Sequence, residues 1–504
     1  MIDENRGEKN VSDTVRVAQG YVRGKEDNGI LAFKGIPYAA APIGVHRFKE
    51  PTAAPAWEGI RDTTEYGPTA PSLPYSPPLD QLMEEPVIEG PDYLNLNVWT
   101  PATDAGRRPV LVWIHGGAFA NGSGAVSAYD GSRFARDGVV CVTINYRLGA
   151  EGFLQIDGAP ANRGLLDQIA ALRWVRDNIA AFGGDPDAVT IAGESAGAMS
   201  VMTLLSTSQA AGLFRRAIAE SGAGHHVQTA ASAAKVTAAI AEELGVEATL
   251  ASFSAVSPAD LLAAQGVVGQ MISEAPDPTV WGELATSPMP FQPVIDGAFV
   301  AARPIDRFAA GVGRDVDVLI GTNAQEAALF LVPNGAADAA NEDTLASILA
   351  LVGADPDVVL PVYRQAQPSA SAGELLVTWL TDWFYRVPAA RVAESRMMHG
   401  ADTHVYEFGW PSPLLDGRLG ACHTAEIAFA FDQLATPASA MIAGVNPPQK
   451  LADEMHGAWV SFVKGGDPGW SPYGEDRIVR RLNVHSDTAR DPAPDQRRIW
   501  DGIR

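Results

Sequence analysis

The sequence predicts an α/β protein in which helices cover both faces of a mostly parallel central sheet. Two observations lead to this prediction. Short runs rich in β-branched residues are apolar on both alternating faces, as strands buried on two sides are, at 109–114, 139–146, 188–192, 316–321 and 403–408. Helical stretches separate these runs, and the strand–helix alternation is clearest between residues 109 and 222.

The helices are expected from the spacing of apolar residues. Over 165–182 apolar side chains recur at a spacing near 3.6, and a Gly-Gly pair follows as a stop signal. Residues 334–398 are also mostly helical in pattern, but strand-like sequence resumes at Thr403. We therefore expect one domain over 1–504, with 334–398 as a helical insertion, although length alone would suggest about three domains. The seven prolines within 68–91 predict a long surface loop.

The composition excludes several classes of partner. The chain has 37 Lys and Arg against 60 Asp and Glu, a net charge of -23 that repels nucleic acid and anionic membrane surfaces. Its two cysteines, Cys141 and Cys422, cannot build a disulfide framework, and no C-x-x-C motif occurs. The first ten residues are polar and no run of 18 residues is apolar, so we expect neither a signal peptide nor a membrane span. A cytoplasmic protein of a reducing compartment is expected.

The G-x-S-x-G sequence at Gly193–Gly197 provides a candidate nucleophile. Alone the pattern is weak, because it arises by chance in roughly one chain in several of this size. Here it directly follows the expected strand 188–192 and precedes an Ala/Met/Leu-rich helix over 198–205. A tight strand-to-helix turn exposes a serine hydroxyl, and small flanking residues tolerate the turn. Ser195 is therefore the candidate, and a solvated serine in a plain loop is the alternative.

A second glycine motif, His115–Ala118 (HGGA), immediately follows the expected strand 109–114. Consecutive glycines leave backbone N–H groups free to point into one cavity, which is what stabilises a tetrahedral oxyanion. Each such donor contributes roughly 3 kcal/mol to the transition state. We expect the N–H groups of Gly116, Gly117 and Ala196 to form this oxyanion hole, unless the motif is an ordinary glycine turn.

A nucleophilic serine needs a base, and the base needs an orienting acid. His423 lies in a glycine-opened loop after the last expected strand, and Glu326 lies just past the strand 316–321. The order Ser195, Glu326, His423 is the nucleophile–acid–base order of this architecture. The adjacent His225 and His226 have no third ligand at metal-binding spacing, so no metal site is expected. The remaining histidines are expected to be surface or packing residues: His46, His399, His404, His456 and His485.

With these motifs the chain resembles the type-B carboxylesterases, which include bacterial para-nitrobenzyl esterases and, more distantly, the cholinesterases. The resemblance runs from about residue 15 to 473 and rests on motifs at 33–51, 93–101, 115–124, 145–154, 162–186 and 193–200. It implies the α/β-hydrolase fold, the triad Ser195–Glu326–His423, and the oxyanion donors Gly116, Gly117 and Ala196. It also implies that Glu194 and Ser221 lie just behind the triad and that Arg147 and Asp167 form a structural ion pair.

The sequence departs from the family pattern in two places. Pro91–Leu94 (PDYL) stands where the family usually has Glu-Asp-Cys-Leu, so the cysteine that closes a disulfide in secreted relatives is missing. The lost glutamate leaves Arg47 without its usual partner, for which Glu89 is a candidate. Gln325–Ala327 replaces the usual Asp-Glu-Gly and keeps the carboxylate.

The resemblance predicts a serine carboxylesterase that needs no cofactor and acts on esters of aromatic or bulky alcohols. We expect a monomer or weak homo-oligomer, with the helical insertion near the active-site entrance and activity rising through an apparent pKa of roughly 6 to 7. Two alternatives remain open: a carbamate or anilide hydrolase using the same triad, and a non-catalytic interaction module. Candidates for the substrate pocket, although residues of these types belong to the core more often than to a pocket, are Phe119, Met199, Trp379, Trp383 and Phe384.

Overall fold

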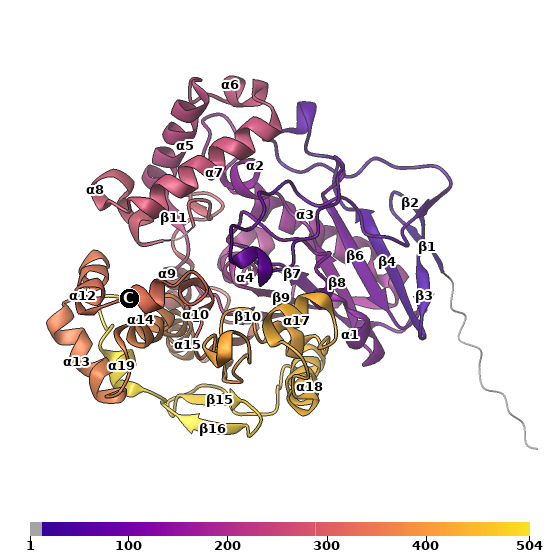
Figure 1. Ribbon diagram of the computed structural model, residues 1–504. Helices are drawn as coiled ribbons and strands as arrows, with labels where there is room; N and C mark the ends of the chain where they lie inside the picture. The colour runs from indigo at the N-terminus through magenta and orange to yellow at the C-terminus, as the bar shows by residue number, and fades with distance from the viewer. Residues whose placement is uncertain (1–12, 288) are drawn as a thin grey trace, which may run out of the picture.

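The computed structural model describes residues 13–287 and 289–504. Its centre is an 11-stranded sheet with the strand order β16-β15-β14-β13-β10-β9-β7-β8-β6-β4-β3 (Figure 1). All neighbours from β8 to β15 are parallel, whereas β3, β4 and β6 at one edge and β16 at the other pair antiparallel. The strands are β3 (Lys25–Asp27), β4 (Ile30–Pro37), β6 (Asn95–Thr100), β7 (Arg108–Ile114), β8 (Val140–Ile144), β9 (Gly184–Glu194), β10 (Arg216–Glu220), β13 (Asp317–Asn323), β14 (Thr403–Phe408), β15 (Ile478–Leu482) and β16 (Asp487–Arg490).

The five expected strands correspond to β7, β8, β9, β13 and β14, so the mostly parallel α/β sheet is confirmed. Strand β7 shows why these runs are apolar on both faces. Val110 and Val112 pack into one core together with helices α3 and α4, whereas Leu111 and Trp113 pack into a second core with α1 and α18. Because side chains alternate across a strand, both faces must be apolar to be covered by helices.

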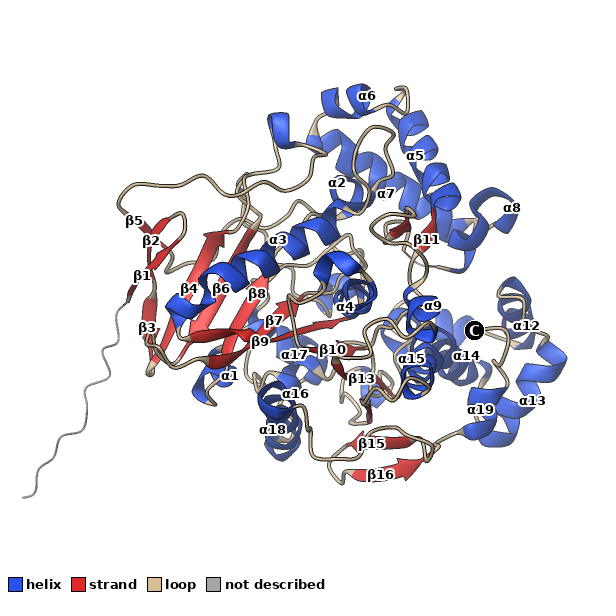
Figure 2. Cartoon of the chain, turned by 180° about the vertical axis from the view of Figure 1, so that it is seen from behind, coloured by secondary structure: helices blue, strands red, loops and turns tan. Residues whose placement is uncertain are grey.

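The helices of these two layers alternate with the strands along the chain. Figure 2 shows helices α3 and α4 in front of the sheet. Helix α3 begins at Arg163, continues into a 3-10 turn and ends where Gly183 adopts a φ of 75°, as the Gly-Gly stop predicts. Helix α4 begins directly after Ser195, so its first turn adjoins the C-terminal end of β9. The helices are α1 (Ser132–Arg136), α2 (Gly149–Phe153), α3 (Arg163–Asn178), α4 (Ala196–Ser206), α9 (Pro304–Ala309), α16 (Ile427–Ala430), α17 (Pro437–Ala443) and α18 (Gln449–Gly465).

Two helical excursions leave the sheet. The expected one lies between β13 and β14 and consists of α10 (Ala328–Leu331), α11 (Ala336–Ala339), α12 (Glu342–Leu351), α13 (Pro356–Ala366), α14 (Ala372–Thr381), a π-helix (Asp382–Arg386) and α15 (Val387–Met397). Together with α19 (Pro494–Arg498) it surrounds a smaller core that includes Trp500. The other lies between β10 and β13 and contains α5 (Ala230–Leu244), α6 (Leu250–Ala255), α7 (Pro258–Glu274) and α8 (Pro278–Trp281).

Two small sheets complete the structure: β1 (Thr14–Val17), β2 (Gly20–Arg23) and β5 (Ile60–Asp62) form one, and β11 (Gln228–Thr229) and β12 (Val294–Ile295) form the other. Within the described residues no helix is both long and apolar enough to cross a membrane. Nor do His, Cys, Asp and Glu side chains of that part of the chain gather into a group that could hold a metal ion.

Candidate active site

Ser195 occupies the turn between β9 and α4 in a strained conformation, with φ 55° and ψ -123°. Its N–H donates to the Glu220 carbonyl of the neighbouring strand at 2.9 Å, which fixes the turn against the sheet. The turn is so tight that a Cβ at Gly197 would lie 1.9 Å from the Ile114 carbonyl oxygen. Only glycine fits there, and the half-buried serine side chain is held at the C-terminal edge of the sheet.

The loop after β7 runs beside this turn. A Cβ at Gly116 would lie 3.0 Å from the Cβ of Ser195, and Gly117 has a φ of 104°. Among the described residues, the backbone N–H groups of Gly116, Gly117 and Ala196 donate to no protein acceptor. Three free donors therefore lie around the serine, which is the arrangement an oxyanion requires.

His115 holds the start of this loop in place. Its Nδ1 donates to the Gly116 carbonyl at 2.8 Å, and its ring stacks on Tyr146 with 4.5 Å between centroids. The Tyr146 hydroxyl donates to the His115 carbonyl at 2.9 Å. Burial lowers the pKa of His115 to about 4, so the ring is neutral near pH 7 and acts as a structural group.

Glu326 and His423 come together from two segments that follow β13 and β14. The Glu326 Oε2 accepts a hydrogen bond from His423 Nδ1 at 2.7 Å, and its Oε1 accepts one from the Asn323 N–H at 2.7 Å. Glu326 is completely buried and His423 is 4% exposed. The carboxylate therefore fixes both the orientation of the imidazole and the nitrogen that carries its proton.

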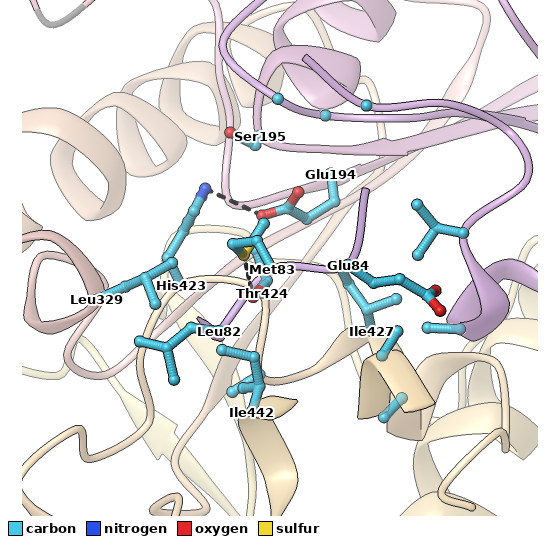
Figure 3. A pocket seen from close by; sticks show the side chains of 18 of the residues that line it. Leu82, Met83, Glu84, Glu194, Ser195, Leu329, His423, Thr424, Ile427 and Ile442 are labelled. Atoms are coloured by element: carbon cyan, nitrogen blue, oxygen red, sulfur yellow. Dashed lines mark hydrogen bonds and ion pairs between the residues drawn. The ribbon is translucent and has the colours of Figure 1, made fainter. Parts of the chain in front are cut away.

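The other ring nitrogen of His423 faces Glu194, as Figure 3 shows, with 3.1 Å between Nε2 and the Glu194 Oε1. In the described structure the Ser195 hydroxyl makes no hydrogen bond to His423. Burial alone would lower the pKa of His423, but the carboxylates of Glu194 and Glu326, with Glu426, outweigh it and raise this pKa to about 9. Burial also raises the pKa of Glu194 well above its ordinary value. His423 thus lies between two carboxylates, and Glu194 competes with Ser195 for Nε2.

A further carboxylate, Glu426, was not found by the sequence analysis. It is completely buried, and its Oε1 accepts a hydrogen bond from the Ser221 hydroxyl at 3.1 Å. The Asn323 side chain donates to its other oxygen. Burial raises the pKa of Glu426 to about 7. Its position in the sequence, three residues after the candidate base His423, is the signal that could have suggested it.

Beside Ser195 lies a cavity of about 950 Å³, part of it open to solvent. Most of the wall is apolar, and much of it comes from segments without a sequence signal for a substrate pocket. The lining side chains include Tyr75, Leu79, Leu82, Met83 and Glu84 of the proline-rich loop, Val126, Ala128 and Tyr129, Leu329 and Phe330, and Thr424, Ile427, Ser439 and Ile442.

The residues that the sequence suggested for the pocket do not line this cavity, so that expectation is corrected. Phe119 is fully buried against Phe153, at 4.9 Å between ring centroids, and Met199 is enclosed in α4. The three aromatic residues of the helical insertion turn towards other partners: Trp379 and Trp383 pack on Trp500, and Phe384 packs on His226. The neighbouring Tyr385 lies on the site instead, 5.0 Å from the His423 ring.

Arg147 and Arg47, the two arginines for which the sequence suggested partners, each form an ion pair. Arg147 and Asp167 are both buried, and their side chains meet at 2.6 Å, which confirms the expected pair. Arg47 pairs with Glu151 at 2.7 Å and also donates to the Phe253 carbonyl at 3.4 Å. Glu89, the candidate from the sequence, is therefore not its partner.

Comparisons with known proteins identify the family of this chain. The model of the carboxylesterase family matches residues 11–483. The para-nitrobenzyl esterase of Bacillus subtilis (strain 168) is 36% identical over 500 residues, or 96% of this chain and 97% of the relative. The phenmedipham hydrolase of Pseudarthrobacter oxydans is 35% identical and covers 89% of each chain. The solved structure of Geobacillus stearothermophilus carboxylesterase EST55 has a TM-score of 0.85 and 36% identity, covering 97% of this chain and 100% of its own.

A mostly parallel sheet with a serine at a strand-to-helix elbow, and with helices on both faces, defines the α/β-hydrolase class. Within that class, the chain belongs to the carboxylesterase family and is a carboxylic ester hydrolase. The alternative of a non-catalytic interaction module is therefore set aside.

Proposed function

We propose that this chain is a serine carboxylesterase that works through an acyl-enzyme on Ser195. The observation that carries the proposal is the convergence of three groups at one edge of the sheet: the elbow serine, the His423–Glu326 pair at 2.7 Å, and the free N–H groups of Gly116, Gly117 and Ala196. Each group comes from a different segment. Their common position is what covalent acyl transfer requires.

In the proposed mechanism, His423 Nε2 takes the proton of the Ser195 hydroxyl as the serine oxygen attacks the ester carbonyl. The carbonyl oxygen becomes an oxyanion that the three N–H groups bind. His423 then donates its proton to the leaving alcohol, and a water molecule repeats the cycle on the acyl-enzyme. Glu326 stabilises the imidazolium at both stages. The first step requires Nε2 to exchange its contact with Glu194 for one with Ser195, an adjustment that substrate binding can bring about.

The contact with Glu194 predicts an altered pH dependence. Only neutral His423 accepts a proton, so kcat/KM should rise with pH through the pKa of this residue. Because neighbouring carboxylates favour the imidazolium, we expect an apparent pKa above the 6 to 7 of an ordinary catalytic histidine. Replacing Glu194 by Gln removes one negative charge and should shift the profile to lower pH. The measurement is kcat/KM against pH for both proteins; an unchanged midpoint in Glu194→Gln would contradict this account of His423.

The apolar cavity supports esters with aromatic or bulky alcohols as substrates, because its wall can bury such a group. The relative named phenmedipham hydrolase favours a second candidate, a carbamate or anilide hydrolase with the same triad.

The test of this choice compares kcat/KM for an aryl ester with those for the anilide and the aryl carbamate of equal acyl size. We expect the ester to be hydrolysed at least ~10²-fold faster than the anilide, since we assign the protonation of a nitrogen leaving group to His423 alone. About 2.7 kcal/mol is within the reach of one missing proton donor. If the anilide or the carbamate equalled or exceeded the ester, the second candidate would replace the first.

Other features complete the proposal. We place the protein in the cytoplasm because Cys141 and Cys422 are both free and buried, as in a reducing compartment. The net charge of -23 supports a protein that binds no nucleic acid.

We propose one domain that acts as a monomer or weak homo-oligomer. The segment 334–398 would be an insertion beside the site entrance, since β13 and β14 pair directly around it and Tyr385 reaches His423.

A further inference from the structure

The cavity beside Ser195 contains one charged group that the proposed reaction does not use. Among the described residues that line it, the carboxylates are Glu84 and Glu194, and no Lys or Arg is present. Glu194 is occupied by His423. Glu84 lies among apolar side chains, with Leu82 and Met83 before it and Val126 and Ala128 nearby on the wall. In Figure 3 its side chain extends away from Ser195 and His423, towards the opposite side of the cavity.

The hydrogen bonds of Glu84 leave it able to bind a ligand. Its Oε2 accepts from the Ser127 N–H at 2.6 Å, which holds the side chain in place. Within the described residues its Oε1 accepts no hydrogen bond, and the carboxylate forms no ion pair. A carboxylate oxygen offers about two lone-pair sites, so the group retains capacity for a strong donor.

The next residue shows the contrast between a structural and a free carboxylate. Glu85 accepts hydrogen bonds from the Ser72 hydroxyl at 2.8 Å, the Asn121 side chain at 2.6 Å and the Tyr75 N–H at 3.3 Å. These bonds fix the proline-rich loop against the loop after β7. Glu85 therefore accounts for the position of this segment, and the fold does not need the charge of Glu84 for the same purpose.

The location of the cavity indicates which half of an ester would meet Glu84. His423 Nε2 must reach the leaving oxygen in order to protonate it, and the cavity wall continues from His423 through Thr424 and Ala425 to Ile427. The alcohol half of the substrate, which carries the leaving oxygen, therefore occupies this cavity. An apolar wall with one carboxylate at its far side fits an alcohol with a hydrophobic body and a cationic end.

We propose that Glu84 is a specificity-determining residue that binds a protonated amine on the alcohol half of the substrate, an inference that rests on the proposed function. The ammonium group donates to the free Glu84 Oε1, and the hydrophobic body of the alcohol covers the apolar wall. The same carboxylate repels an anionic alcohol. The net charge of -23 also slows the approach of anionic substrates.

The experiment uses two acetates of nearly equal shape, those of para-(aminomethyl)benzyl alcohol and para-ethylbenzyl alcohol. For the wild-type protein we expect kcat/KM to be at least about 10-fold higher for the ammonium ester, the scale of one hydrogen bond to a charged group. Glu84→Gln keeps an oxygen acceptor for the Ser127 N–H but loses the charge. It should remove this preference, mainly through KM, so that the two esters are hydrolysed with similar kcat/KM.

The matched control is Glu89→Gln, which removes the same charge from an exposed position on the same loop. It should leave the preference intact. A second pair of esters carries the aminomethyl or the ethyl group on the acyl half, with a simple alcohol, and should show no dependence on Glu84. If Glu84→Gln and wild type discriminate equally, or if the acyl pair alone responds, the inference is overturned while ester hydrolysis stands.

A binding measurement separates this inference from the proposed function. Calorimetric titration with para-(aminomethyl)benzyl alcohol and para-ethylbenzyl alcohol, the products themselves, requires no catalysis. The amino alcohol should bind wild type at least about 10-fold more tightly than its neutral counterpart, and Glu84→Gln should bind the two equally. Lack of turnover of every ester would reject the proposed function, whereas equal binding of the two alcohols to wild type would reject the role of Glu84.

Discussion

Replacing Ser195 by alanine is expected to lower kcat for an aryl acetate by roughly 10⁶-fold, the scale of nucleophile loss in a serine protease. The hydroxyl is the proposed covalent attachment point, and no other hydroxyl occupies the elbow. Residual hydrolysis would come from the oxyanion donors and from substrate binding alone. The measurement is the initial rate with a chromogenic ester at saturating concentration.

The same substitution should leave folding intact. Ser195 is half-buried, and its hydroxyl makes no hydrogen bond in the described structure, so its removal costs little free energy of unfolding. The thermal midpoint of Ser195→Ala should therefore match that of wild type. Ser273→Ala, which changes an exposed serine on α7, is the control and should retain full activity. A folded Ser195→Ala protein with substantial kcat would assign the nucleophile to another residue.

The second large effect is expected for Glu326→Gln. Glutamine preserves the shape of the side chain and an oxygen acceptor for the Asn323 N–H, but it presents an amide N–H group to His423 Nδ1. The imidazole would then favour the wrong tautomer, and its cationic form would lose the charge that stabilises it. We expect a loss of about 10⁴-fold in kcat, the value for Asp→Asn in a serine protease triad.

The decisive readout for Glu326→Gln is kcat in a protein shown to be folded by its circular dichroism spectrum. Glu194 also faces His423, at 3.1 Å from Nε2, and is the residue that could take over the orienting role. Near-normal kcat in Glu326→Gln, together with a large loss in Glu194→Gln, would mean that Glu194 is the orienting acid.

The central part of the fold could be predicted because its strands are buried on both faces. Strands such as β8 are buried throughout and almost entirely apolar, and this pattern is visible in the sequence. The last two strands carried no such signal: β15 and β16 are short and contain charged residues, because β16 at the edge of the sheet has no buried residue and β15 beside it is only partly buried. Strand β10 was also missed, since Arg216 and Glu220 at its ends interrupt a short Ala/Ile run.

The reactive groups of the site were predictable for a different reason. Ser195, Glu326 and His423 each follow a strand, and parallel strands bring their C-terminal ends to one edge of the sheet. A glycine motif also marks the turn at Ser195, because a Cβ at Gly197 would clash with the Ile114 carbonyl oxygen. The structure brings these three residues together beside one cavity.

The cavity wall could not be predicted, because it depends on the direction of side chains and on long-range contacts. The proline-rich segment 68–91 was expected to be a surface loop. Much of it is exposed, but Tyr75, Leu79, Leu82, Met83 and Glu84 also contribute to the wall. The bond between Glu85 and Asn121 that holds the segment there joins positions 36 residues apart. Conversely, Trp383 in the helical insertion turns to Trp500, a partner more than a hundred residues away in the sequence. Neither contact has a local sequence signal.

Peptide mass spectrometry after reaction with a sulfonyl fluoride tests most directly whether one serine forms the covalent intermediate. The account predicts one equivalent of adduct, located on Ser195, with loss of esterase activity in proportion to labelling. It also predicts slower labelling in Glu326→Gln, whose base is misoriented. An adduct on any other residue, or complete inactivation without modification of Ser195, would contradict the account.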